Sequence, residues 1–398
     1  MRISLFGYGI TTKAIAKKFA PNCFIYDDKF QENSQDEFGN KLLVCGEYNP
    51  AQSDVDIPSP GFLPNHALIK KAKHLTSEYD FFEMPPSVWI SGTNGKTTTT
   101  QMLKYLLASR GAAEGGNIGN PIANLDKTAP LWILETSSFT LHYTNRAAPD
   151  VYLLLPIRPD HISWHGSFEE YEKAKLKPLL SMIEGSVAII PKEYSSITSN
   201  AMLIGYEDSA DLAKTMDIDI NEINIKEPFL LDALLALSAA KILFDEADID
   251  KINTFKIDKH KLEEFYDNQG RFWVNDTKGT NVDATIEALK RYKDKKILIV
   301  LGGDDKGVDL TRFFEFMKAY DVEIFAIGSN AQKIITFSEK TGKIVHECKT
   351  LEVAVKKIDE RLDKNGVGLL SPAAASLDQF NSYIERGELF ISLVKALN

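Results

Sequence analysis

The sequence predicts an α/β protein built from three modules. Its 398 residues exceed the roughly 250–300 residues at which a single hydrophobic core stops growing. Short apolar, β-rich runs alternate with helical patterns along most of the chain, which is typical of βαβ units and mainly parallel sheets. Two interruptions, Met84-Pro85-Pro86 and the lysine-rich stretch Asp250–Lys261, each precede a new strand pattern. We therefore expect domains at residues 1–84, 85–258 and 259–398.

The individual elements follow from these patterns. Predicted strands are Arg2–Phe6, Ser87–Ile90, Leu131–Leu134, Val151–Leu155, Val187–Ile190, Lys296–Leu301 and Glu323–Ile327. Predicted helices are Thr97–Ser109, Phe229–Leu243, Val282–Tyr292 and Leu351–Leu362.

Composition excludes several classes of protein. Hydrophobic residues make up 44% of the chain and charged residues 26%, and no apolar run approaches the roughly 18 residues of a spanning helix. The net charge of -10 argues against nucleic acid as the main partner. The first residues lack a signal-peptide pattern, and three scattered cysteines are too few for a disulfide framework. We expect a cytoplasmic monomer that does not insert into a membrane.

The first glycine cluster, Gly7-Tyr8-Gly9-Ile10-Thr11-Thr12, follows a strand and opens a helix. Thr12 stands where a dinucleotide fingerprint has its third glycine, and Asp27-Asp28 follows the second strand pattern. A dinucleotide site, a nucleotide-diphosphate site and a plain tight turn all fit these residues.

The sharpest motif is Ser91-Gly92-Thr93-Asn94-Gly95-Lys96-Thr97-Thr98, between a strand and a helix. Glycines let backbone N–H groups face an anion, Lys96 can reach the β- and γ-phosphates, and the Thr97 hydroxyl can bind Mg²⁺. Ile90 replaces the first glycine of the full phosphate-loop pattern, so this is a shorter form. The alternative, glycines that only make a tight turn, leaves the lysine and threonine unexplained.

Polar residues follow two further strands of the middle domain. Glu135 ends an apolar run and is placed to hold Mg²⁺ directly or through water, or else is a solvated strand-end acid. The segment Arg158–Gly166 gathers His161, His165 and an aspartate after the next strand, which suggests a metal or phosphate site. The lysines that follow, Lys173, Lys175 and Lys177, ordinarily indicate a solvated helix face.

The third domain has three polar loops after strands. Asn275–Asn281, Gly302–Gly307 and Ser371–Ser376 offer donors, acceptors and small residues at strand ends. Together they favour a binding face.

Taken in order, these motifs resemble those of the Mur ligases. The matching segments are Gly92–Thr97, Gly116–Gly119, Glu135–Phe139, Asp160-His161, Asn275–Asn281, Gly302–Gly307 and Leu370–Phe380 followed by Arg386-Gly387. The resemblance spans essentially the whole chain. Within the family, the N-terminal module and the run Ser371–Phe380 are most similar to the branch that adds D-glutamate to UDP-N-acetylmuramoyl-L-alanine.

The resemblance implies a Rossmann-like N-terminal domain for UDP, a central P-loop domain for ATP and a Rossmann-like C-terminal domain for the amino acid. It also implies an ATP-dependent amide ligase of cytoplasmic peptidoglycan synthesis. The substrate carboxylate would attack the γ-phosphate of ATP, and the amine of D-glutamate would then attack the acyl phosphate. Phosphorylation turns a poor acyl donor into a reactive one.

The resemblance also implies roles for single residues. Lys96, His161 and Lys175 would be catalytic, and Thr97, Glu135, His161 and Lys175 would hold two Mg²⁺ ions, with Lys175 carried as a carbamate. Gly92 to Thr98, Lys261 and Asp276 would contact ATP. Ile10, Thr11, Asp27 and Asn117 would contact the UDP substrate. Lys278, Thr280, Lys306, Ser376 and Tyr383 would surround D-glutamate.

Some positions depart from the family pattern. Ser163 replaces an acid, Pro228-Phe229 replaces a His-Asn pair near adenine, and Lys261 replaces an arginine, which alone can make a bidentate fork. We expect altered nucleotide affinity rather than lost activity. The competing interpretations are a Mur ligase for another amino acid, a folylpolyglutamate synthase-like ligase, a non-catalytic nucleotide-binding module, and an oxidoreductase that uses the first glycine loop.

Overall fold

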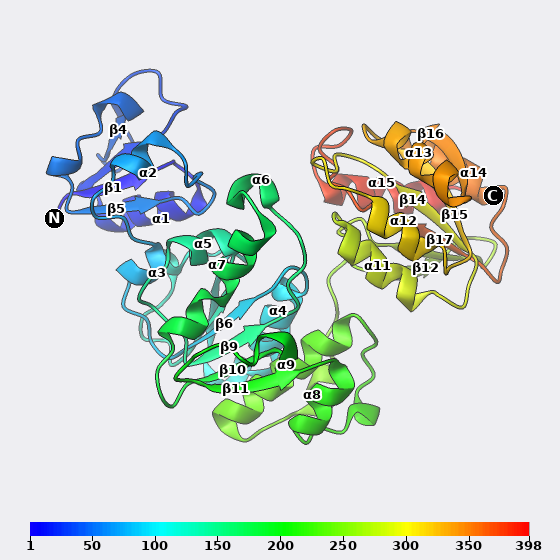
Figure 1. The fold of residues 1–398 in the computed structure, drawn as a ribbon, viewed down its shortest axis with the longest axis horizontal. Coiled ribbons are helices and arrows are strands. Elements are labelled where there is room, and N and C mark those ends of the chain that lie inside the picture. Colours follow the sequence, from blue (N-terminus) through cyan, green and yellow to red (C-terminus); the bar gives the residue numbers. More distant parts are fainter. Residues whose placement is uncertain (398) are drawn as a thin grey trace. The chain divides into compact units, whose positions relative to one another are not determined.

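The computed structural model describes residues 1–397 and contains three separate β-sheets (Figure 1). The chain divides into two compact units, Met1–Phe255 and Lys256–Asn398. The first unit holds two of the sheets and the second unit holds the third. Strands alternate with helices along the chain, so the α/β class predicted from the sequence is confirmed. The boundaries predicted at residues 84 and 258 stay predictions.

The first sheet has five strands in the order β3-β4-β2-β1-β5. Its strands pair in parallel, except that β3 is antiparallel to β4. The strands are β1 Ile3–Phe6, β2 Cys23–Tyr26, β3 Ser34–Gln35, β4 Lys41–Leu43 and β5 Val55–Pro58, and the helices are α1 Ile10–Phe19, α2 Ala67–Lys71 and α3 Glu78–Phe81.

The second sheet has six strands in the order β11-β10-β9-β6-β8-β7, and all of them pair in parallel. Its strands are β6 Ser87–Ser91, β7 Ala113–Gly116, β8 Trp132–Glu135, β9 Val151–Leu154, β10 Val187–Pro191 and β11 Met202–Tyr206. Its helices are α4 Lys96–Leu106, α5 Ser138–Tyr143, α6 Ile162–His165, α7 Phe168–Ser181, α8 Ser209–Thr215, α9 Phe229–Phe244 and α10 Ile249–Asn253.

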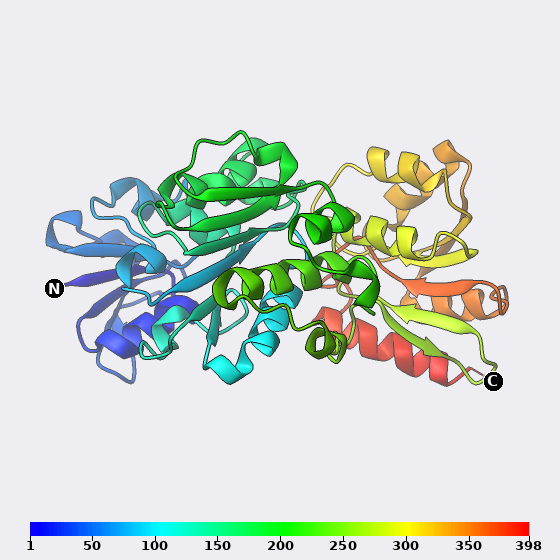
Figure 2. The same ribbon diagram turned by 90° about the horizontal axis from the view of Figure 1, so that it is seen from below.

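Helices cover both faces of this second sheet. Helices α5 and α7 pack together on one face, and α4 and α9 pack together on the other (Figure 2). The central strands are therefore buried on both sides, which explains why β6, β8 and β9 read as continuous apolar runs. Their carboxyl ends meet at one edge, where polar loops can gather.

The third sheet has six strands in the order β12-β13-β17-β14-β15-β16, parallel except for β12 against β13. Its strands are β12 Glu263–Tyr266, β13 Phe272–Asn275, β14 Ile297–Leu301, β15 Val322–Ile327, β16 Ile344–Lys349 and β17 Val367–Leu370. Its helices are α11 Val282–Arg291, α12 Thr311–Met317, α13 Ala331–Thr341, α14 Leu351–Asp359 and α15 Tyr383–Lys395. Across residues 1–397, no helix is long and apolar enough to cross a membrane.

Candidate active site

The loop between β6 and α4 has the backbone shape of a phosphate-binding turn. Gly92 and Gly95 have positive φ angles of +136° and +86°. A Cβ atom at Gly95 would lie 2.3 Å from Oδ1 of Asp232, so this position excludes a side chain. The Nζ of Lys96 donates to the backbone oxygens of Gly92 (3.0 Å) and Thr93 (2.7 Å). The ammonium thus lies against the loop, beside the first turn of α4, where a phosphate would be stabilised.

A hydroxyl, a carboxylate and an amide meet at the carboxyl edge of the second sheet. The Oγ1 of Thr97 donates to Oε2 of Glu135 (2.8 Å), and the Nδ2 of Asn117 donates to Oε1 of the same carboxylate (2.6 Å). Glu135 is only 2% exposed, so the interpretation as a solvated strand-end acid is wrong. Asn117, predicted to meet the muramoyl substrate, here orients the Glu135 carboxylate.

Lys175 lies inside the protein, although its place among charged residues of a helix suggested a solvated face. It is 1% exposed, and its Nζ donates to the backbone oxygen of Gly92 (2.7 Å) and to Oγ of Ser91 (3.3 Å). Lys96 and Lys175 therefore donate to the same carbonyl oxygen. Burial lowers the pKa of Lys175 well below its ordinary value, and the nearby Lys96 lowers it further, whereas Asp160 and Glu135 oppose the shift.

His161 is placed beside this edge through an aromatic contact. It has a left-handed backbone with φ of +52° and precedes α6. Its ring centroid lies 4.7 Å from that of Phe139, which is in α5. Its Nε2 lies 3.5 Å from Oδ2 of Asp160. The strained turn aims this histidine toward α5.

Two further residues lie at this edge: His165, which belongs to the segment predicted as a metal or phosphate site, and Asp232, for which the sequence predicted no role. The Nε2 of His165 lies 3.0 Å from Oγ of Ser138, and burial lowers the pKa of His165 to about 4. Asp232, in the first turn of α9, is 3% exposed and accepts a hydrogen bond from Oγ1 of Thr99 (3.1 Å). The Asp232 contact joins residues 133 positions apart, a pairing that the spacing of residues in the sequence does not reveal.

The first glycine cluster and Asp27 come together in the first sheet. The backbone N–H of Tyr8 donates to Oδ2 of Asp27 (2.7 Å), and Oγ1 of Thr12 donates to the backbone oxygen of Gly7 (2.8 Å). Ile10 is 71% exposed at the start of α1. Thr12 therefore braces the turn where a third glycine would stand, and the predicted uridine contacts Ile10, Thr11 and Asp27 lie around one loop.

The three polar loops of the second unit also meet one another. The backbone N–H of Ala373 donates to the oxygen of Gly279 (3.0 Å), and that of Asp304 donates to the oxygen of Ala375 (2.9 Å). This is a consequence of the sheet order, since β13, β17 and β14 are neighbours and share one carboxyl edge.

The residues predicted to surround D-glutamate lie on these loops and on α15. The Nζ of Lys278 lies 4.1 Å from the ring centroid of Tyr383. Lys306 is exposed and has a left-handed φ of +52°, whereas Ser376 is buried and its backbone oxygen closes a turn. Thr280 lies two residues after Lys278, and its backbone N–H donates to the oxygen of Lys278 (2.8 Å).

Asp276 is buried rather than open at the strand end. Its Oδ2 accepts from Oγ of Ser371 (2.6 Å), and its Oδ1 accepts from the backbone N–H of Leu262 (3.2 Å). Burial raises the pKa of Asp276 to about 7. Lys261 precedes Leu262 in the chain, and its Nζ lies 3.2 Å from Oδ2 of Asp258.

Comparison with known proteins assigns this architecture to a family. Residues 90–220 match the Mur ligase middle domain. The chain is 55% identical to the UDP-N-acetylmuramoylalanine–D-glutamate ligase of Campylobacter jejuni subsp. jejuni serotype O:23/36 (strain 81-176), over 100% of both chains. It is 46% identical to the enzyme of the same name from Helicobacter pylori (strain ATCC 700392 / 26695), over 99% of both chains. The chain belongs to the Mur ligase family.

Solved structures support the fold of this Mur ligase. The ADP complex of MurF ligase from Thermotoga maritima superimposes with a TM-score of 0.57 at 17% identity, over 86% of this chain and 88% of the other. MurF from Acinetobacter baumannii superimposes with a TM-score of 0.61 at 14% identity, over 93% of this chain and 84% of the other. The family resemblance read from the loops is confirmed, and with it the assignment as an ATP-dependent ligase of peptidoglycan synthesis.

Thr97 and Glu135 of this Mur ligase offer oxygen ligands that suit a Mg²⁺ ion. Mg²⁺ prefers oxygen ligands such as hydroxyl and carboxylate groups. Thr97 and Glu135 present one of each, and Oγ1 of Thr97 lies 2.8 Å from Oε2 of Glu135. Lys175 as an ammonium is a cation and cannot be a ligand, so a second ion would need it as an anionic carbamate. Among residues 1–397, no three His, Cys, Asp or Glu side chains gather as a metal cluster.

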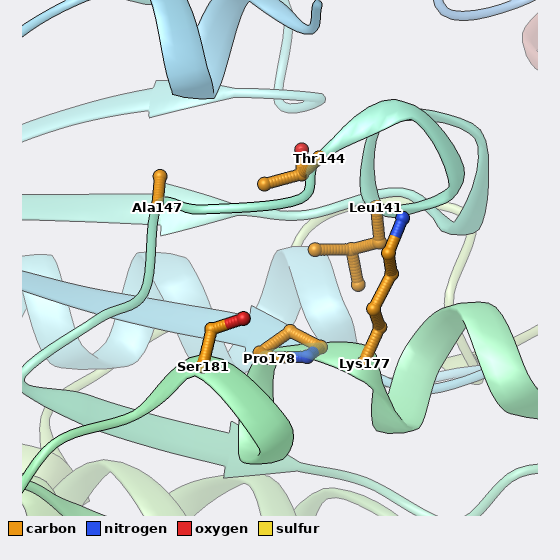
Figure 3. Close-up of a pocket in the computed structure, with 6 residues that line it drawn as sticks. All are labelled: Leu141, Thr144, Ala147, Lys177, Pro178 and Ser181. Carbon is orange, nitrogen blue, oxygen red and sulfur yellow. The ribbon is translucent and has the colours of Figure 1, made fainter.

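A crevice lies between α5 and α7 of the Mur ligase. Six residues line it: Leu141, Thr144, Ala147, Lys177, Pro178 and Ser181 (Figure 3). Its interior has no room for a water molecule, and the Lys177 ammonium donates to the backbone oxygen of His142 (2.8 Å). None of the predicted site residues lines it, so this crevice is a packing gap rather than a ligand site.

Proposed function

We propose that this Mur ligase joins D-glutamate to UDP-N-acetylmuramoyl-L-alanine, converting ATP to ADP and phosphate, in the cytoplasm and as a monomer. The observation that carries the proposal is the full-length 55% identity to a relative named for this reaction. The contact of Thr97 with Glu135 beside the phosphate loop supports the phosphoryl-transfer half of the reaction.

In the first step, the carboxylate of UDP-N-acetylmuramoyl-L-alanine attacks the γ-phosphorus of ATP, and the bond from the γ-phosphorus to the β,γ-bridging oxygen breaks. Lys96 offsets the charge of the β- and γ-phosphates, and the glycine turn from Gly92 to Thr98 directs backbone N–H groups at them. Bound Mg²⁺ would neutralise further phosphate charge, held by Thr97 and Glu135. Asn117 keeps the Glu135 carboxylate oriented.

In the second step, the amine of D-glutamate attacks the acyl carbon and the amide bond forms. The bond from the acyl carbon to the oxygen that bridges it to phosphorus breaks, and phosphate leaves with that bridging oxygen. The nitrogen of D-glutamate gives up its excess protons to water in this step. Lys278, Thr280, Lys306, Ser376 and Tyr383 are proposed to hold the amino acid, with Lys306 as partner for a carboxylate. Ile10, Thr11, Asp27 and Asn117 are proposed contacts of the UDP substrate, and Lys261 and Asp276 of the nucleoside of ATP.

His161 and Lys175 are the remaining proposed catalytic residues. Burial lowers the pKa of Lys175, and a lowered pKa favours the neutral amine that a reaction with carbon dioxide requires. A carbamate there would replace a positive charge beside Lys96 by a negative one. Mass spectrometry of the intact protein in bicarbonate, with Lys175→Arg as control, tests this modification.

The proposed reaction is tested by phosphate release from ATP with UDP-N-acetylmuramoyl-L-alanine. D-glutamate, L-alanine, meso-diaminopimelate and L-lysine are added in turn, and product is identified by mass. We expect turnover only with D-glutamate. Equal turnover with another amino acid, or release that ignores D-glutamate, would overturn the assignment.

A further inference from the structure

Arg386 is a buried cation behind the proposed amino-acid loops. It lies in the first turns of α15 and is 1% exposed. Its Nε donates to Oγ1 of Thr277 (2.9 Å), and its Nη2 donates to the backbone oxygens of Thr277 (3.0 Å) and Ala374 (3.2 Å). One guanidinium therefore ties the loop after β13 to the loop after β17.

The tied segments are those that carry proposed D-glutamate contacts. Thr277 precedes Lys278, and its Oγ1 also donates to the backbone oxygen of Tyr383 (3.0 Å). Ala374 lies two residues before Ser376. Movement of Arg386 would therefore shift three of the proposed contacts together.

All acceptors of Arg386 are neutral. Within the described part of the chain, no carboxylate lies within the 4.0 Å of an ion pair with this guanidinium. The acids whose charge acts on it are Asp378 and Asp276. Asp378 accepts from the backbone N–H of Ser329, and Asp276 accepts from Ser371, so both carboxylates are engaged elsewhere.

A buried cation without a counterion in contact is costly for the fold. Burial lowers the pKa of Arg386 only to about 10, so it stays charged at neutral pH. Neutral donors can also bond hydroxyl and carbonyl oxygens, so the hydrogen bonds alone do not require a charge. A positive charge at this place is instead suited to an incoming anion, and D-glutamate carries two carboxylates and one ammonium.

We propose that Arg386 is a positioning residue that favours an acidic amino acid, because it braces the Thr277 and Ala374 loops and supplies a buried positive charge behind them. This inference rests on the proposed function, since it takes D-glutamate as the incoming amine.

The test compares Arg386→Gln, which removes the charge, with Arg386→Lys, which keeps the charge but not the planar fork. Steady-state phosphate release gives kcat and the KM values for D-glutamate and ATP. We expect Arg386→Gln to raise the KM for D-glutamate about tenfold or more, which corresponds to about 1.4 kcal/mol. The KM for ATP should change less than twofold. Arg386→Lys should recover most of the lost affinity for D-glutamate.

Arg271 provides a matched control in the same unit. It is also buried, but Asp267 and Asp359 pair with it at 2.7 and 2.5 Å. Arg271→Gln should lower Tm and leave the KM for D-glutamate unchanged. Equal defects in both Arg386 variants, or no change of the KM for D-glutamate in Arg386→Gln, would overturn the inference. If Arg386→Gln fails to fold, Arg386→Lys alone tests the inference, because it keeps the positive charge. A tenfold rise of its KM for D-glutamate would then count against a role of the charge.

Failure of the proposed function gives a different result. In that case the wild-type protein itself would not respond to D-glutamate. A wild-type response together with unaffected Arg386 variants would refute only the role of Arg386.

Discussion

Replacing Gly95 by alanine should lower kcat/KM for ATP, because the added Cβ atom would overlap two neighbouring side chains at an unfavourable backbone angle. The Cβ atom would lie 2.3 Å from Oδ1 of Asp232 and 2.8 Å from Cδ2 of Leu155. An alanine at the observed φ of +86° costs about 1–2 kcal/mol by itself. Moving the Asp232 carboxylate away from Thr99 would add about 1–3 kcal/mol, because a buried acceptor loses one of its hydrogen bonds. If the loop moves instead, Lys96 and Thr97 are displaced from the phosphates.

A Gly185→Ala variant separates the cost of the positive φ angle from the cost of the contact with Asp232. Gly185 has nearly the same backbone angle, φ of +90°, but a Cβ atom there meets nothing within 4 Å. This variant should lose only about 1–2 kcal/mol of stability, with normal kinetics. For Gly95→Ala, a displacement of about 1 Å at reacting groups predicts a loss of about 100-fold in kcat/KM for ATP.

The assay is phosphate release against ATP concentration, with denaturant unfolding of both variants in parallel. The reasoning about the Asp232 contact would be refuted if the two variants had the same kcat/KM and the same stability. A fully active Gly95→Ala protein would further show that the loop does not bind phosphates.

Three more outcomes follow from the structure. Lys96→Ala should reduce turnover at least about 100-fold, because the charge of the transferring phosphoryl group loses its ammonium partner; a near-normal rate would remove Lys96 from the mechanism. Lys306→Ala should raise the KM for D-glutamate and leave that for ATP largely intact, and a selective effect on ATP would assign Lys306 another role. Glu78 is buried, its Oε2 has no hydrogen-bond partner, and burial raises its pKa to about 8. Between pH 4.5 and 8, the Glu78 carboxyl group has therefore lost its proton in the unfolded chain but keeps it in the folded chain. As pH rises through this range, Glu78 lowers the free energy of unfolding by up to about 1.4 kcal/mol per pH unit. The Glu78→Gln variant lacks this titration. Its free energy of unfolding, relative to that of the wild type, should therefore be higher at pH 8 than at pH 5. If the free energies of unfolding of both proteins change with pH in the same way, the raised pKa of Glu78 is contradicted.

Several features of the fold were readable in the amino-acid sequence because they depend on local patterns. The strand preceding the phosphate loop was predicted as Ser87–Ile90 and is Ser87–Ser91, and the helix predicted as Phe229–Leu243 is Phe229–Phe244. Parallel βαβ order also implies that loops after neighbouring strands share an edge. That is why Thr97 and Glu135 could be expected near each other before any distance was known.

The environment of single side chains could not be read in this way. Lys175 looks like any lysine on a charged helix face, yet the packing of α7 buries it beside Lys96. Asp232 and Arg386 make contacts across 133 and 109 residues, which no local pattern records.

The sequence by itself determined the α/β class, the order of the loops and the family, since periodicity and motif spacing are properties of the chain. Only the tertiary structure decided which polar groups are buried, which carboxylate Thr97 and Asn117 share, and which cation lies without a counterion. The physical reason is that burial and pairing depend on the surfaces that distant elements present to one another.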